Sequence, residues 1–249
     1  MLSNIRVVLV RTFHSGNIGS TARAMKTMGI TNLYLVSPKD FNSDAGRAEA
    51  LKMAMSANDV VEHATIVDSL YEAVKDCSIV IASTARSRGY DLPLLTPEES
   101  AISLCNHAKK SQVCLVFGPE RMGLHNDDLQ FAKYRVTIPT SPDYSSLNLA
   151  AAVQTLSYEI FKASEKLATK DISKDKNTVD EMPDMEALEQ FYQHLELTLN
   201  ESGFIFKNHP GKIMLKLRQL FTKAEPNVTE LNILRGMLAS FQNKKHKQK

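Results

Sequence analysis

Short apolar runs alternate with amphipathic segments through the first two-thirds of the chain. The run from Ile5 to Val10 is rich in β-branched residues, which is typical of a strand buried on both faces. The same pattern predicts further strands at Leu33 to Val36, Thr65 to Val67, Ile79 to Ala82, Val113 to Phe117 and Arg135 to Ile138. Between them it predicts helices at Asn17 to Met28, Ala45 to Met55, Asn126 to Phe131 and Leu147 to Leu167.

Capping residues refine two more helices in the same region. Asp68 is the expected N-cap of a helix that runs to Lys75, and Thr96 is the expected N-cap of a helix that starts at Pro97. The segment from Pro93 to Pro97 is expected to be a turn. Strands separated by helices of this length predict an α/β fold, with a mostly parallel sheet covered by helices on both faces.

The pattern changes after Leu167. Residues 168–183 are rich in Lys, Asp and Asn with few apolar positions, and we interpret them as a linker. Residues 184–249 carry three amphipathic stripes at helical spacing, so we expect a small all-α module. The predicted division is therefore 1–167 for the α/β domain, 168–183 for the linker and 184–249 for the helical module.

Composition excludes several classes of protein. The 249 residues are 43% hydrophobic and 23% charged, as is usual for a globular chain, and no apolar run approaches the length of a membrane span. The three cysteines match no zinc or redox spacing, so we expect buried, reduced thiols. The histidines show no metal-binding spacing either, and we expect a cytoplasmic protein without a metal site.

The net charge of +2 conceals a basic C-terminal segment. Residues 201–249 contain ten Lys or Arg and three Glu, which leaves the rest of the chain mildly acidic. A basic segment of this kind suits nucleic-acid binding, although a solvated terminal segment is an equally good explanation on charge alone.

Four loops follow predicted strands, at the edge of the sheet where ligands bind in open α/β folds. Gly16 and Gly19 lie in the first loop and could admit a ligand to the backbone, or they could belong to an ordinary strand-to-helix turn. The sequences of the other three loops are Ser83-Thr84-Ala85-Arg86-Ser87-Arg88, Gly118-Pro119-Glu120-Arg121-Met122-Gly123 and Pro139-Thr140-Ser141-Pro142-Asp143-Tyr144-Ser145-Ser146-Leu147-Asn148. Hydroxyl groups, arginines and glycines in such loops suit phosphate or ribose contacts.

Together these loops resemble the SPOUT superfamily, and most closely its TrmH-like 2′-O-ribose methyltransferases. Asn17 and Arg23 match the N-x-x-x-x-x-R motif of that branch, and the next two motifs are G-x-E-x-x-G and S-L-N, matched by Gly118, Glu120, Gly123, Ser146, Leu147 and Asn148. The loop at 83–88 and two C-terminal segments, Leu217 to Phe221 and Glu230 to Gly236, are similar to the tRNA methyltransferases that modify cytidine or uridine at nucleotide 32 of the anticodon loop.

The resemblance implies a C-terminal trefoil knot in the sheet, with S-adenosylmethionine as cofactor and tRNA as the macromolecular partner. It implies a homodimer whose active site lies at the subunit interface, with neither DNA nor a membrane as partner. The cofactor-binding residues carried over from the family are Ser83, Thr84, Ala85, Gly118, Ile138, Ser145, Ser146 and Leu147.

The resemblance also implies roles for individual side chains. The catalytic set is Arg23, Asn17, Glu120, Ser146 and Asn148, and the expected RNA-binding residues are Arg86, Arg88 and Tyr144. Arg23 reaches the partner's cofactor site in this family, where it either takes the proton of the ribose hydroxyl or grips the adjacent phosphate. A guanidinium normally stays protonated, so the first role would require a large fall in its pKa; either role makes Arg23 essential.

Two alternatives to a tRNA 2′-O-methyltransferase remain open at this stage. A ribosomal RNA 2′-O-methyltransferase would share the same catalytic loops and differ only in its RNA-contacting surface. A knotted RNA-binding protein without catalysis is the second alternative, and the intact Arg23, Glu120 and Asn148 argue against it.

Overall fold

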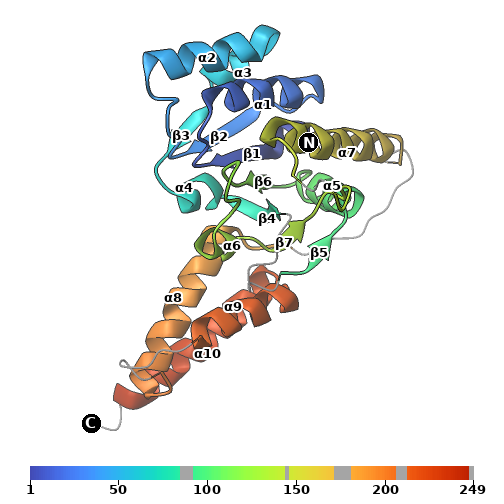
Figure 1. Ribbon diagram of the computed structural model, residues 1–249. Helices are drawn as coiled ribbons and strands as arrows, with labels where there is room; N and C mark the ends of the chain where they lie inside the picture. Colours follow the sequence, from blue (N-terminus) through green and yellow to red (C-terminus); the bar gives the residue numbers. More distant parts are fainter. Residues whose placement is uncertain (85–91, 144–145, 171–180, 206–211, 247–249) are drawn as a thin grey trace. The chain divides into compact units, whose positions relative to one another are not determined.

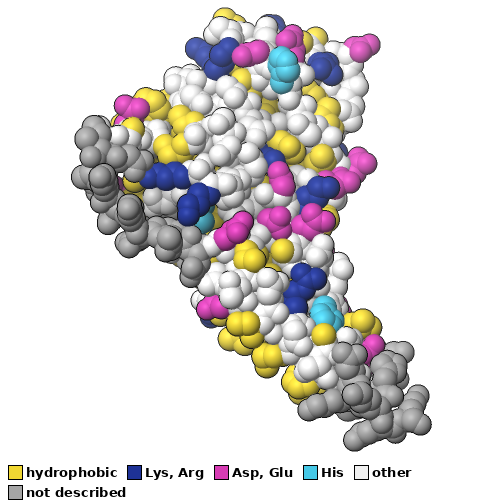
Figure 2. Space-filling model, turned by 180° about the vertical axis from the view of Figure 1, so that it is seen from behind, with side chains coloured by type: hydrophobic (Ala, Val, Ile, Leu, Met, Phe, Trp, Pro, Cys, Tyr) yellow, Lys and Arg dark blue, Asp and Glu magenta, His cyan; other side chains and the backbone are white. Residues whose placement is uncertain are grey.

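The chain folds into two compact units, residues 1–175 and 176–249. The computed structural model describes residues 1–84, 92–143, 146–170, 181–205 and 212–246 (Figure 1). Ala85, Arg86, Arg88, Tyr144 and Ser145 therefore lie outside the described residues, as do residues 171–180 of the predicted linker. On the face drawn in Figure 2, Lys, Arg, Asp and Glu side chains are scattered among apolar and uncharged ones.

The first unit is built on a seven-stranded sheet with the order β3-β2-β1-β6-β4-β7-β5, and every strand pair in it is parallel. The strands are β1 (Ile5–Val10), β2 (Asn32–Val36), β3 (Thr65–Val67), β4 (Cys77–Ser83), β5 (Leu94–Leu95), β6 (Gln112–Phe117) and β7 (Tyr134–Val136). β1 lies between β2 and β6, so that Leu9 is opposite both Leu35 and Phe117. The predicted α/β class with a mostly parallel sheet is confirmed.

Helices cover both faces of this sheet (Figure 1). Ile5, Val7 and Leu9 point from β1 into a core shared with α1 (Ser15–Thr27), α5 (Pro97–His107) and α7 (Leu149–Lys170). α2 (Asp44–Ala54) and α3 (Asn58–Glu62) pack against α1, while α4 (Leu70–Val74) and α6 (Asn126–Leu129) lie on the other side of the sheet.

Arg6 interrupts the apolar run of β1 and yet is only 3% exposed. Its guanidinium forms two hydrogen bonds of 2.8 Å with the carboxylate of Asp76, donates to the carbonyl of Ala73 and stacks 3.9 Å from the centre of the Tyr34 ring. A buried charge is tolerated when it is paired in this way. Arg6 thus anchors the end of α4 to the sheet.

Apolar periodicity and capping residues predicted most element boundaries to within a few residues of those in the structure. The capping box predicted at Thr96 and Glu99 is present, with the Thr96 side chain accepting from the Glu99 backbone N–H and the Glu99 side chain accepting from that of Thr96. The prediction for α4 was wrong by one residue, because Ser69 rather than Asp68 is its N-cap. The predicted turn after Pro93 was also wrong: Leu94 and Leu95 form β5, which pairs with β7.

The cysteines and the apolar content of the helices were also predicted from the sequence. Cys77, Cys105 and Cys114 are all free and buried, as predicted, and burial raises the pKa of the Cys105 thiol to about 11. Within the described part of the chain, no helix combines the length and the apolar character needed to cross a membrane.

The second unit consists of α8 (Met185–Ser202), α9 (Ile213–Ala224) and α10 (Val228–His246). Phe191, Tyr192 and Leu231 are central to its core, and the N-cap of α8, Asp184, accepts a hydrogen bond from the Ala187 backbone N–H. The guanidinium of Arg218 makes two hydrogen bonds, of 2.7 and 2.6 Å, to the carboxylate of Glu189 and lies 4.3 Å from the Tyr192 ring centre. This half-buried pair links α8 to α9.

Candidate active site

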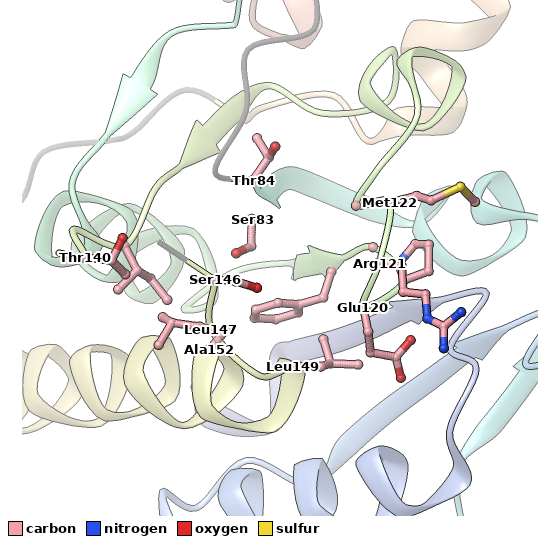
Figure 3. A pocket seen from close by; sticks show the side chains of 15 residues that line it. Ser83, Thr84, Glu120, Arg121, Met122, Thr140, Ser146, Leu147, Leu149 and Ala152 are labelled. Carbon is pink, nitrogen blue, oxygen red and sulfur yellow. The ribbon is translucent and has the colours of Figure 1, made fainter. Parts of the chain in front are cut away.

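A pocket opens at the carboxyl edge of the sheet, beside the ends of β4, β6 and β7 and the start of α7 (Figure 3). Three of the four loops singled out in the sequence contribute to its lining. The lining residues are Ser83, Thr84, Phe117, Gly118, Pro119, Glu120, Arg121, Met122, Gly123, Ile138, Thr140, Ser146, Leu147, Leu149 and Ala152. The parallel sheet thus brings together segments that are far apart in the chain.

Glu120 is turned toward the loop that follows β1. Its carboxylate accepts hydrogen bonds from the backbone N–H groups of Phe13 (3.1 Å) and His14 (3.4 Å) and from the side-chain amide of Asn17 (2.7 Å). Partial burial by itself raises the pKa of Glu120, but the hydrogen bonds from Asn17 and the backbone outweigh it, and the net pKa lies below the ordinary value. Glu120 is therefore an ionised acceptor at neutral pH rather than a proton donor.

Asn17 connects this hydrogen-bond network to the start of α7. Its side-chain oxygen accepts from the side-chain amide of Asn148 at 3.0 Å, and the side-chain oxygen of Asn148 accepts from the backbone N–H groups of Ala150 (2.9 Å) and Ala151 (3.4 Å). Asn148 thereby caps the first turn of α7. One continuous chain of hydrogen bonds, Glu120–Asn17–Asn148, joins the three sequence motifs.

The turn that carries Glu120 has little freedom to move. The Gly123 backbone N–H donates to the Pro119 carbonyl at 2.8 Å, and Gly123 has a φ of +67°, in the left-handed region. A Cβ at Gly118 would lie 2.3 Å from the Leu124 nitrogen. Both glycines of the G-x-E-x-x-G motif are therefore required by the shape of the turn itself.

Gly19 has a different role from the ligand approach considered for it in the sequence. A Cβ at this position would lie 1.9 Å from the carbonyl oxygen of Ala50 in α2. Gly19 therefore permits close packing of α1 on α2. This agrees with the alternative considered for the first loop, an ordinary strand-to-helix turn without a ligand.

The pocket also gathers several of the predicted cofactor residues. Ser83, Thr84, Ile138, Ser146 and Leu147 line it together with Gly118. The Thr84 backbone N–H donates to the Val136 carbonyl at 3.0 Å, and the Thr137 hydroxyl donates to the Thr84 carbonyl at 2.6 Å. These bonds hold the end of β4 against the segment that follows β7.

Arg23 is separate from this group. It is exposed on α1, does not line the pocket, and its guanidinium makes no hydrogen bond or ion pair with any residue that the structure describes. Arg23 is therefore not part of the hydrogen-bonded chain Glu120–Asn17–Asn148.

The sequence reasoning missed an ion pair beside the site. Arg11 has a φ of +50° and forms a bidentate pair with Asp128, whose carboxylate also accepts from the His125 backbone N–H at 2.7 Å. The pair ties the loop after β1 to α6, close to the loops that carry Asn17 and Glu120. The only local signal was a charged residue directly after a buried strand.

Several pocket-lining residues were also missed, including Arg121, Met122, Thr140, Leu149 and Ala152. Arg121 and Met122 occupy the unspecified positions of the G-x-E-x-x-G motif, so the motif itself gave no reason to select them. Within the described ranges, His, Cys, Asp and Glu side chains form no group of three or more that could hold a metal ion.

Comparison with known protein families matches both units. Residues 4–158 match the SpoU rRNA Methylase family, and residues 186–249 match the C-terminal domain of the tRNA methyltransferase TrmJ. The chain belongs to the SpoU rRNA Methylase family. It is accordingly an RNA methyltransferase, and its C-terminal unit groups it with the TrmJ members.

Individual relatives of this SpoU-family chain agree with that assignment. It is 52% identical over 240 residues to the tRNA (cytidine/uridine-2′-O-)-methyltransferase TrmJ of Photorhabdus laumondii, an alignment that covers 96% of this chain and 97% of the relative. The crystal structure of TrmJ from Z. mobilis ZM4 superposes with a TM-score of 0.79 at 35% identity, covering 95% of this chain and 98% of that one. A probable methylase family protein from Haemophilus influenzae Rd KW20 gives 0.66 at 42% identity over the whole of both chains.

Proposed function

We propose that this chain transfers the methyl group of S-adenosylmethionine to the ribose 2′-hydroxyl of cytidine or uridine at nucleotide 32 of the tRNA anticodon loop. The observation that carries the proposal is the hydrogen-bonded chain Glu120–Asn17–Asn148 at the edge of a pocket. Its support comes from the TrmJ relatives, which are named for 2′-O-methylation of cytidine and uridine in tRNA and align over nearly the full length.

The lining of the pocket fits the cofactor. Phe117, Ile138, Leu147 and Leu149 offer apolar surface, while the hydroxyls of Ser83, Thr84 and Ser146 and nearby backbone groups offer hydrogen bonds, as an adenosine and an amino-acid group require. The residues that would hold it are Ser83, Thr84, Ala85, Gly118, Ile138, Ser145, Ser146 and Leu147. The bound cofactor supplies an activated methyl group on a sulfonium. In this proposal the backbone around the pocket forms the trefoil knot of the SPOUT fold.

The chain's own residues then align the ribose and exclude water. Glu120 stays ionised and fixes Asn17, and Asn17 fixes Asn148 at the start of α7, so that the site is organised before RNA arrives. The proposal includes a homodimer, in which the exposed Arg23 of one subunit reaches the pocket of the other and grips the phosphate beside the reacting ribose. Arg86, Arg88 and Tyr144 complete the proposed RNA contacts.

The test uses purified protein, S-adenosylmethionine labelled on its methyl group, and unmodified tRNA and ribosomal RNA in separate reactions. Nuclease digestion then identifies the labelled nucleoside and whether the methyl is on the ribose. We expect a 2′-O-methyl pyrimidine from the tRNA anticodon loop. Label in ribosomal RNA alone would retain the chemistry and overturn the substrate, a relevant outcome because the matching family is named for rRNA methylation.

A further inference from the structure

Arg121 is the one cationic side chain among the described residues that line the pocket. It stands in the turn between Pro119 and Gly123, directly after Glu120. Figure 3 shows its guanidinium on the same side of the turn as the Glu120 carboxylate. A positive charge is thus located at the edge of the proposed methyl-transfer site.

The guanidinium of Arg121 has no partner in the described part of the chain. It is exposed and has no hydrogen bond or ion pair with any residue in the described ranges. Three other arginines are paired: Arg6, Arg11 and Arg218 each form a bidentate pair with a carboxylate. Arg121 therefore has its full hydrogen-bonding capacity available for a ligand.

The backbone beneath Arg121 is held in place. The hydrogen bond from Gly123 to Pro119 closes the turn at 2.8 Å, and Gly118 packs against the backbone of Leu124 so closely that a Cβ would not fit. A guanidinium carried on a fixed turn loses less conformational entropy on binding than one on a freely moving loop.

The neighbouring Glu120 carboxylate is not paired with this guanidinium. Glu120 accepts hydrogen bonds from Phe13, His14 and Asn17, and no ion pair joins it to Arg121. These three donors hold the Glu120 carboxylate in place and leave the Arg121 guanidinium without this carboxylate as a partner. A guanidinium suits an anionic ligand that offers two oxygen acceptors.

We propose that Arg121 binds one of the two backbone phosphates that flank the reacting ribose, alongside the phosphate contact proposed for Arg23 of the other subunit. The inference rests on the proposed function in one respect, that the group brought to the pocket is a ribose. Every internal ribose in RNA is covalently joined to phosphates on both sides, so bringing the 2′-hydroxyl to the pocket brings a phosphate close to its edge. A guanidinium can hold two phosphate oxygens at once.

The experiment measures RNA binding directly, without requiring methyl transfer. An unmodified anticodon stem-loop RNA is titrated with the full-length protein over a range of salt concentrations, using fluorescence anisotropy. Wild type is compared with Arg121→Gln, Arg121→Lys and the control Lys52→Gln, which removes a charge from the exposed surface of α2. Calorimetric titration with S-adenosylmethionine and thermal unfolding of each variant accompany these measurements.

We expect Arg121→Gln to weaken RNA binding about tenfold, as for the loss of one charge-assisted contact. The slope of log affinity against log salt should become shallower by about 0.7, the value for one phosphate contact on a single strand. Arg121→Lys should retain part of the affinity, because lysine keeps the positive charge but lacks the paired N–H donors of the guanidinium. Lys52→Gln should match wild type, and cofactor affinity should be unchanged throughout.

Equal RNA affinity and equal salt slope in Arg121→Gln and wild type would overturn the proposal. Weakened cofactor binding in Arg121→Gln would also overturn it, and would indicate that Arg121 holds the cofactor carboxylate instead. Failure of the proposed reaction would appear separately, as absence of labelled product from wild-type protein.

Discussion

At the scale of single residues, Glu120 joins two motifs that are 103 residues apart in the chain. Its three donors, two backbone N–H groups and the Asn17 amide, all require a carboxylate that accepts. The sequence identified Glu120 as part of a motif, whereas its orientation toward the loop after β1 depends on the neighbouring positions of β1 and β6 in the sheet.

The substitution Glu120→Gln tests this role. The amide keeps the size of the side chain but replaces one acceptor oxygen by an NH2 donor. This NH2 group cannot accept from the Phe13, His14 and Asn17 donors that surround the carboxylate in the wild type. We expect methyl transfer to fall by about 10- to 100-fold, in keeping with the loss of one or two hydrogen bonds to a charged group. Steady-state assays with labelled cofactor measure the loss, and circular dichroism should show an unchanged fold.

The same substitution has a signature in the pH dependence of stability. The folded-state pKa of Glu120 is lowered, so its contribution to stability is present above its unfolded-state pKa of about 4.3 and is lost as pH falls through the folded-state value. The difference in unfolding free energy between wild type and Glu120→Gln should therefore be constant above about pH 5.5 and shrink below about pH 4.3. A difference that grows toward acid would contradict an ionised acceptor.

Arg23→Lys distinguishes the two roles open to Arg23. The side chain is exposed and unpaired among the described residues, which favours the phosphate contact. An ammonium cannot reproduce a two-oxygen grip, so we expect activity to fall at least about tenfold by the same factor at every pH. Retained activity with one limb of the pH profile displaced would identify Arg23 as the base instead. The pH dependence of kcat/KM is the measurement.

At the scale of elements, the helices and strands were largely predicted because their signals are local. Apolar periodicity and the capping box of α5 depend on residues a few positions apart, and both survive in the structure. The two wrong assignments have different causes. Ser69 competes with Asp68 as an adjacent cap, and β5 is formed only because Leu94 and Leu95 meet β7.

The contact between α1 and α2 yields a prediction with a control on the same helix. Gly19→Ala would place a Cβ 1.9 Å from the Ala50 carbonyl, and the helices can separate only at a cost of about 1–3 kcal/mol or more. At Gly16 a Cβ would meet the end of the Glu49 side chain at 3.0 Å, which can move, and the Met53 side chain at an ordinary contact distance of 3.5 Å. Thermal and denaturant unfolding should therefore show a large loss for Gly19→Ala and almost none for Gly16→Ala. Because alanine favours a helix more than glycine does, helix propensity would stabilise both variants, and equal losses would show that the contact with Ala50 does not set the effect.

At the scale of the whole molecule, the proposed homodimer divides the active site between subunits. Glu120, Asn17 and Asn148 form one group within a subunit, while Arg23 is exposed elsewhere on α1. A two-fold symmetric dimer would repeat this division at two equivalent sites.

Mixing two inactive variants tests the division. In a heterodimer of Arg23→Ala and Glu120→Ala, one site combines the intact Glu120 of the first subunit with the intact Arg23 of the second. Random pairing of equal amounts should restore about a quarter of the wild-type activity, because half of the dimers carry one functional site of two. If Arg23 served its own subunit, the mixture would stay as inactive as either variant, and unmixed samples of each provide the baseline.

The sequence by itself determined the class of fold, most of its elements and the three motifs, because periodicity, capping and motif spacing are read within short stretches of chain. The tertiary structure alone decided that these motifs are joined by one run of hydrogen bonds, that Gly19 packs helices and that Arg121, at the edge of the pocket, has no partner among the described residues. The physical reason is that such contacts link residues that only the order of parallel strands brings together. The residues next to Glu120 and Arg121 in the sequence do not indicate which groups each side chain contacts.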